Sequence, residues 1–124
     1  MQKRIINSFL LVVIGFLFFS ACTSDVIEPA AGPSPTDTIK FSAQIQPIFT
    51  SNCAGCHSPG GPAPVLKPGL SYQSLIDGNF VNTVSPDQSI IYTVMKSGGS
   101  MAAYANAEQA TLVLAWIKQG ALNN

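Results

Sequence analysis

Cys53-Ala54-Gly55-Cys56-His57 is the stretch around which the whole chain is organised. Two cysteines three positions apart, followed at once by a histidine, form the Cys-x-x-Cys-His signature of covalent haem attachment. This spacing lets each thiol add to one vinyl group of the same porphyrin, and it places the histidine beneath the iron as an axial ligand. The motif therefore predicts one covalently bound haem c, held by Cys53, Cys56 and His57.

The motif also has other interpretations. A redox-active dithiol usually lies where a strand turns into a helix in a βαβ unit, and the sequence contains no such pattern. A structural zinc site needs four ligands, whereas the chain has three cysteines and one histidine. Haem attachment is the favoured interpretation, and the dithiol and the metal site remain open alternatives.

The N-terminal region of the sequence has the composition of an export signal. Lys3 and Arg4 precede the apolar residues 9–19, a run too short and too close to the terminus for a good membrane span. The run ends in small residues just before Cys22, which resembles a bacterial lipoprotein signal. We therefore expect residues 1–21 to be a signal peptide, cleaved before a lipid-modified Cys22. An ordinary cleaved signal peptide and an uncleaved anchor are the alternatives.

The sequence from Cys22 onward divides into a linker and one domain. Residues 22–38 contain three prolines among alanine, glycine, serine and threonine, a composition typical of an extended flexible tether. Residues 39–124 are long enough for one small domain. Domains of this size often need a staple or cofactor to be stable, so we expect the haem-free domain to be poorly folded.

The hydrophobic pattern of this domain predicts short helices and no strands, because apolar residues recur at three-to-four spacing between stretches of glycine and proline. The expected helices cover residues 46–51 (or 42–51), 71–78, 86–97 and 107–119. Ser71 and Ser85 are expected as N-caps, with Gln88 completing a capping box after Ser85. Tyr72, Leu75 and Ile76 are expected on the inner side of the second helix, and Tyr92 and Trp116 in the core.

The start signal at Ser85 is clearer than that at Ser71, and the last helix is expected to begin after Asn106, with Gln109 three residues later. The segment after the haem motif, residues 58–69, is too rich in proline and glycine to be regular structure. We expect a backbone carbonyl of this loop, from Pro59 or a neighbour, to accept a hydrogen bond from His57 and fix its ring. A merely solvated loop is the equal alternative.

The sixth ligand of the iron decides between functions. Methionine there raises the reduction potential and closes the site for electron transfer. Met95 falls among the apolar positions of a helix, where methionine is usually a core gap-filler. Met101 follows two glycines that allow close backbone approach to the porphyrin. We favour Met101, with Met95 and the absence of a methionine ligand as alternatives.

Several motifs together resemble small class I cytochrome c domains, especially those of lipoproteins and multidomain proteins of environmental bacteria. The similarity is carried by Phe41, Ile45-Gln46-Pro47-Ile48-Phe49, Cys53, Cys56-His57, Ser71-Tyr72, Leu75, Ser89-Ile90-Ile91-Tyr92, Gly98-Gly99, Met101 and Trp116-Ile117-x-Gln119-Gly120-Ala121. The resemblance implies an all-α bundle of three to five short helices around a covalently bound haem. It also implies that the methionine before the last helix, here Met101, binds the iron.

The charge and residue content of the domain bear on its partners. Four lysines balance four acidic residues within residues 37–124, so no basic patch exists for nucleic acid. No acid, base or nucleophile constellation is present, which speaks against an enzyme. We expect a membrane-tethered cytochrome that carries single electrons between extracytoplasmic redox partners, on the periplasmic side or the cell surface. For the lipid anchor on Cys22 we favour the outer membrane.

Two further functions remain as alternatives. The first is a five-coordinate haem protein that binds or senses a small gas or has weak peroxidase activity, which requires that Met101 does not bind the iron. The second is a structural lipoprotein whose Cys-x-x-Cys is a redox switch without haem. Covalently bound colour in the purified protein separates this last alternative from the others.

Overall fold

The computed structural model describes residues 37–124. The predicted signal peptide, the lipid-modified Cys22 and nearly all of the predicted linker lie outside the described residues. The elements are η1 (Phe41–Ile45), α2 (Gln46–Asn52), α3 (Ser71–Asp77), η2 (Pro86–Gln88), α4 (Ile90–Met95) and α5 (Ala107–Lys118). Every regular element in this part of the chain is helical, which confirms the predicted all-α class. Within residues 37–124, each helix is too short or too polar to cross a bilayer.

The first helix starts with one wide π-helical turn, η1, before the regular α2 begins. The N–H of Gln46 donates to the carbonyl of Phe41, five residues back. Pro47 then occupies the first turn of α2, where its missing N–H costs no hydrogen bond. The predicted start near Gln46 is therefore confirmed for the α-helix, and the turn before it adds the buried Phe41 and Ile45 to the core.

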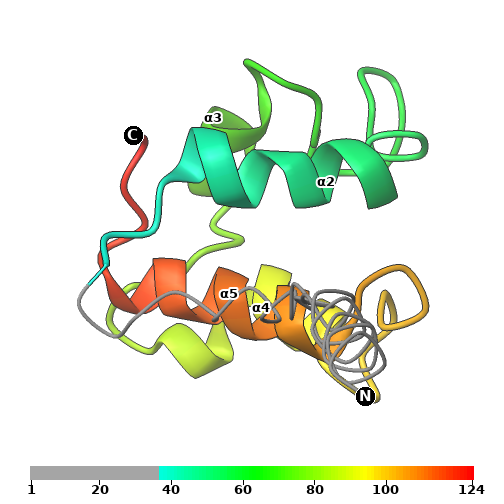
Figure 1. Cartoon of the computed structure of the whole chain (residues 1–124). Helices are drawn as coiled ribbons and strands as arrows, with labels where there is room; N and C mark the ends of the chain where they lie inside the picture. The colour runs from blue at the N-terminus through cyan, green and yellow to red at the C-terminus, as the bar shows by residue number, and fades with distance from the viewer. Residues whose placement is uncertain (1–36) are drawn as a thin grey trace, which may run out of the picture. The chain divides into compact units, whose positions relative to one another are not determined.

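An aromatic cluster at the centre of the core joins the first helix, α3 and α5. The ring centroid of Phe41 lies 5.2 Å from that of Trp116 and 5.3 Å from that of Tyr72. Trp116 is fully buried, and its indole N–H donates to the carbonyl of Leu122 at 2.9 Å. In Figure 1, α2 and α3 lie on one side of the domain and α4 and α5 on the other. The cluster therefore fixes the separation between these two pairs.

The C-terminal residues hold the start of the domain in place. The backbone and side-chain oxygens of Asn124 accept from the N–H groups of Ser42 and Phe41, each at 2.9 Å. The side-chain oxygen of Gln119 accepts from the N–H of Ile39 at 2.8 Å. Because the first N–H groups of a helix have no partner within it, these contacts satisfy donors that would otherwise face solvent or the core.

The second expected helix is present, but two of its details differ from the prediction. The N-cap of α3 is Leu70, and Ser71 is the first helical residue. Ser71 is fully buried, and its hydroxyl donates to the side-chain oxygen of Gln46. Leu75 is buried as expected, whereas Ile76 is 39% exposed. The prediction of Ser71 as N-cap was wrong because a long-range partner takes up its hydroxyl.

The third expected helix is broken in two. Ser89, at ψ 130°, separates the single turn η2 from α4, and Ser85 makes no side-chain cap. The Ser89 hydroxyl accepts from the N–H of Asn82 at 2.9 Å, and the N–H of Ile91 donates to Phe80 at 3.0 Å. These bonds tie the chain to the preceding loop, so the predicted capping box after Ser85 was wrong. Tyr92 is half-buried against the core, as expected.

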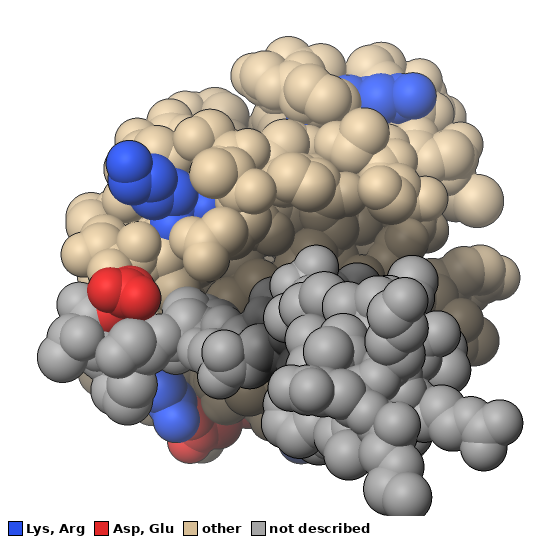
Figure 2. Space-filling view, viewed as in Figure 1, with Lys and Arg blue, Asp and Glu red and all other residues tan. Residues whose placement is uncertain are grey.

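Charged side chains are few and scattered on the face drawn in Figure 2, where most of the described surface is uncharged. Lys118 and Asp87 approach to 3.9 Å, with more than half of each side chain exposed. Exposed pairs of this kind contribute little to stability. The fold therefore depends on its apolar core and on polar contacts with the backbone.

Candidate functional site

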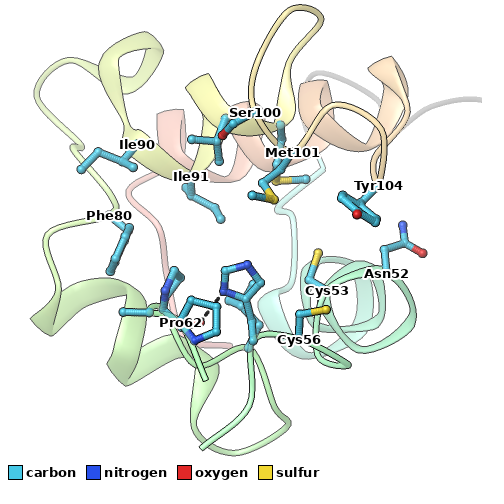
Figure 3. A pocket seen from close by; sticks show the side chains of 16 residues that line it. Asn52, Cys53, Cys56, Pro62, Phe80, Ile90, Ile91, Ser100, Met101 and Tyr104 are labelled. Carbon is cyan, nitrogen blue, oxygen red and sulfur yellow. Dashed lines mark hydrogen bonds between the residues drawn. The ribbon is translucent and has the colours of Figure 1, made fainter. Parts of the chain in front are cut away.

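An apolar cavity of about 290 Å³ lies between the haem motif, the loop after it, α4 and the loop before α5. Its lining consists of Asn52, Cys53, Cys56, His57, Pro62, Ala63, Pro64, Leu66, Phe80, Ile90, Ile91, Val94, Met95, Ser100, Met101 and Tyr104. In Figure 3, Met101 and Ser100 lie across the cavity from Cys53 and Cys56. The structure thus brings all four predicted haem-site residues to one cavity, whose size is close to that of small-molecule sites.

The haem motif forms a tight turn at the end of α2. Cys53 is the residue after the helix, and the N–H of Ala54 donates to the carbonyl of Phe49 at 2.8 Å. The N–H groups of Cys56 and His57 both donate to the carbonyl of Cys53, at 3.1 and 2.9 Å. Ala54 is 3% exposed, so it anchors the turn in the core. The turn leaves both cysteines and the histidine on the cavity wall.

The environment of the thiols differs from that of a redox-active dithiol. Burial raises the pKa of the Cys53 thiol, and Cys53 stands at the carboxyl end of a helix. Reactive cysteines need a lowered thiol pKa, which an amino-terminal helix end or a nearby cation provides. Both thiols are free. Within residues 37–124, no three His, Cys, Asp or Glu side chains gather as metal ligands. The raised thiol pKa and the position of Cys53 at the carboxyl end of α2 are therefore unlike the environment of a redox-active dithiol.

His57 is held by the loop that follows it. Its Nδ1 lies 3.0 Å from the carbonyl oxygen of Pro64. Because a carbonyl only accepts hydrogen bonds, the proton is on Nδ1, and the lone pair of the neutral ring is on Nε2. The prediction that a carbonyl of the following loop holds the imidazole ring of His57 is confirmed. The predicted acceptor, Pro59, was wrong, because the carbonyl belongs to Pro64. The loop folds back so that the N–H of Leu66 donates to the carbonyl of His57 at 2.8 Å.

Gly61 permits this loop to fold against the haem motif. A Cβ at position 61 would clash with the carbonyl oxygen of Cys56 and lie 3.2 Å from that of Ser58. We therefore expect Gly61→Ala to destabilise the domain by about 1–3 kcal/mol, the usual cost of overpacking. Chemical unfolding of the purified protein measures this difference. Gly55→Ala is the matched control, since a Cβ there meets nothing within 4 Å; equal midpoints for the two variants would contradict the prediction.

Met101 is positioned by the loop between α4 and α5. Its N–H donates to the carbonyl of Val94 at 2.8 Å, and its carbonyl accepts from Tyr104 at 3.0 Å. A Cβ at Gly99 would clash with the carbonyls of Thr93 and Val94. The missing side chain of Gly99 thus permits close packing of the loop onto α4, and the expected approach of the two glycines to the porphyrin stays a prediction. Their effect is to turn the chain so that Met101 reaches the cavity.

Met95 also lines the cavity, although the sequence favoured a core role for it. It is 3% exposed and belongs to the core cluster, whereas Met101 is half-buried on the loop. The burial of the two side chains agrees with the prediction that Met95 fills space in the core and that Met101 is the candidate iron ligand. Because both side chains line the cavity, each brings a thioether sulfur to its wall.

Asn52 is a site residue that the sequence analysis missed. Its side-chain N–H group donates to the side-chain oxygen of Gln109 at 3.1 Å. Gln109 also completes the predicted capping box with Asn106 at the start of α5. The contact therefore ties the end of α2, next to the thiols, to the helix that follows the Met101 loop. The only signal in the sequence was the capping box itself, which does not show that Gln109 has a further partner.

Among residues 37–124, the side chains that line the cavity include no Lys, Arg, Asp or Glu. At its edge, Ile90 and Tyr104 are 47% and 61% exposed, so the cavity wall continues onto the surface. Comparison of the chain with protein-family models, curated proteins and solved structures found no match. The case for a function therefore depends on the motif and on the geometry of the cavity.

Proposed function

We propose that this protein is a monohaem c-type cytochrome that carries single electrons between extracytoplasmic redox partners. One observation carries the proposal: Cys53, Cys56, His57 and Met101 line a single apolar cavity, although Met101 is far from the motif in sequence. The haem would occupy this cavity, within a small helical bundle of the cytochrome c type. In this proposal the domain is 39–124, and it is not an enzyme.

The residues of the cavity fit a covalent haem. Cys53 and Cys56 both line the cavity and lie close together on its wall in Figure 3, where their thiols are available for thioether bonds. The hydrogen bond to Pro64 leaves Nε2 of His57 with its lone pair for the iron. Met101 supplies a thioether sulfur from the opposite wall. A haem bound here supplies a one-electron iron couple, and a methionine ligand keeps that couple at a high potential.

The remaining parts of the proposal concern the place of the protein in the cell. A lipid on Cys22 and the linker 22–38 would hold the domain at a bacterial membrane, for which we favour the outer membrane. The domain would face the periplasm or the cell surface. Its partners would be redox proteins, and nucleic acid is not among them. The composition of the N-terminal region supports the anchor and the linker, and the balanced charge of residues 37–124 supports the exclusion of nucleic acid.

The test is an optical spectrum of the exported protein, oxidised and reduced, compared with those of Met101→Ala and Met95→Ala. We expect the oxidised wild type to show the weak far-red band of an iron–sulfur bond, because Met101 closes the sixth position. Only Met101→Ala should lose that band, while Met95→Ala keeps it and loses stability by about 2–5 kcal/mol as a core truncation. Thermal melts recorded alongside the spectra measure the second effect.

Other results would replace the proposal. A high-spin wild type that readily takes up carbon monoxide when reduced has an open sixth position and would be a gas-binding or sensing protein. Loss of the band in Met95→Ala alone would assign the ligand to Met95. Purified protein without any covalently bound colour would favour the redox-switch lipoprotein.

A further inference from the structure

The amide between Pro64 and Val65 is hydrogen-bonded at both ends. Its carbonyl oxygen accepts from Nδ1–H of His57 at 3.0 Å. Its N–H donates to the hydroxyl oxygen of Ser74 at 2.8 Å. Because the carbonyl and the N–H belong to one conjugated peptide group, the two bonds form a continuous chain from α3 to the imidazole.

The surroundings of this amide leave it little freedom to turn. Pro64 and Leu66, on either side of Val65, are both buried. The N–H of Leu66 donates to the carbonyl of His57 at 2.8 Å, and the Leu66 carbonyl accepts from the side chain of Gln46 at 3.4 Å. The two backbone hydrogen bonds of Leu66 thus hold this segment in place. The loop therefore has contacts other than the one with α3 that keep it folded.

Ser74 is the residue of α3 whose side chain reaches this segment. The hydroxyl of Ser71 is directed to Gln46 instead. Gln73 is exposed, and its side chain donates to Asp77 at 2.6 Å. The hydrogen bond between α3 and the loop after His57 is therefore made by the hydroxyl group of Ser74.

We propose that Ser74 is a positioning residue that tunes His57 through the amide of Pro64 and Val65. When the N–H of an amide donates a hydrogen bond, the amide becomes more polarised. Its carbonyl oxygen is then a stronger hydrogen-bond acceptor. A stronger acceptor on Nδ1–H makes the imidazole a better electron donor to a metal. Ser74 thereby stabilises the oxidised iron and lowers the reduction potential. This inference rests on the proposed function.

The test compares the midpoint potentials of wild type, Ser74→Ala, Ser74→Thr and Gln73→Ala, each carrying haem, by equilibrium titration with redox mediators. We expect Ser74→Ala to have the higher potential, because its amide loses the hydroxyl partner. The expected change in the equilibrium with a one-electron mediator is about two- to tenfold, and tenfold equals about 59 mV. Ser74→Thr restores a hydroxyl and should lie near wild type, as should Gln73→Ala, which perturbs the same helix elsewhere.

Two results would overturn the inference while leaving the proposed function intact. One is a haem-loaded Ser74→Ala protein whose potential equals that of wild type, since a purely structural role changes stability alone. The other, measured on wild type and independent of any variant's folding, is rapid hydrogen exchange of the Val65 amide in the reduced protein; we expect this amide to be protected. A wild type without covalent haem would overturn both the inference and the function.

Discussion

Replacing Cys53 and Cys56 together by alanine is expected to abolish covalent haem attachment. Each thiol supplies one thioether bond, and the structure places both on the wall of the cavity that His57 and Met101 also line. Without the thioethers, the haem would be held only by axial ligands and apolar contacts and would be lost on denaturation. The measurement is the mass of the denatured, exported protein together with peroxidase staining for haem in a denaturing gel.

The same variant also tests the expected dependence of folding on haem. The cavity lies between the end of α2 and α4, and α4 contributes Ile91 and Met95 to both the cavity wall and the core. We expect the double variant to lose cooperative thermal unfolding. Gly55→Ala, in the same turn, is the control and should retain both haem and stability. A cysteine-free variant that still holds haem after denaturation would contradict the assignment of the thiols.

Local signals in the sequence predicted local structure well. The capping box of Asn106 and Gln109 is formed as expected, with the Gln109 N–H donating to the Asn106 side chain at 2.8 Å. Such a box needs only residues within one turn of each other, so the sequence contains all the necessary information. The start of α2 at Gln46, before Pro47, has the same local origin.

Predictions that depended on distant partners were less accurate. Ser71 and Ser85 were both predicted as N-caps from their places before helical patterns. The hydroxyl of Ser71 instead donates to the side chain of Gln46, in a different helix. Ser85 starts only the short turn η2, because Ser89 bonds to Asn82 and interrupts the helix. Nothing in the sequence distinguishes these serines, since the partners come together only when the chain is folded.

In the candidate site, too, local signals were predicted better than contacts with distant residues. The four residues that the sequence predicted for the haem site do line one cavity, while haem binding itself stays a prediction. The acceptor for His57 was expected near Pro59 and is Pro64, because several prolines in the loop offer carbonyls and only the return of the chain to Leu66 selects one. Asn52 and Ser74 were not recognised, since their partners lie in other elements.

Trp116 is the core residue whose truncation should have the largest effect on stability. It is fully buried and contacts the rings of Phe41 and Tyr72. We expect Trp116→Ala to destabilise the haem-loaded domain by about 3–5 kcal/mol, through lost apolar contacts and the cavity left behind. Small domains are stable by only about 5–15 kcal/mol, so this change alone brings the protein close to unfolding. Denaturant titration followed by far-ultraviolet circular dichroism measures it.

Trp116→Phe separates the two contributions of this side chain. It keeps an aromatic ring next to Phe41 but removes the indole N–H that donates to the Leu122 carbonyl. We expect the loss of this hydrogen bond itself to cost about 1 kcal/mol. Val84→Ala is the control, because Val84 is 92% exposed and surface changes of this kind stay within about 0.5 kcal/mol. If Trp116→Ala unfolded at the same denaturant concentration as Val84→Ala, the aromatic cluster would not be what holds α5 to the first helix. The cluster joins the first helix, which ends next to Cys53, to α5, which follows the Met101 loop. A partly stable Trp116→Ala protein should therefore also lose the far-red band before its helices unfold.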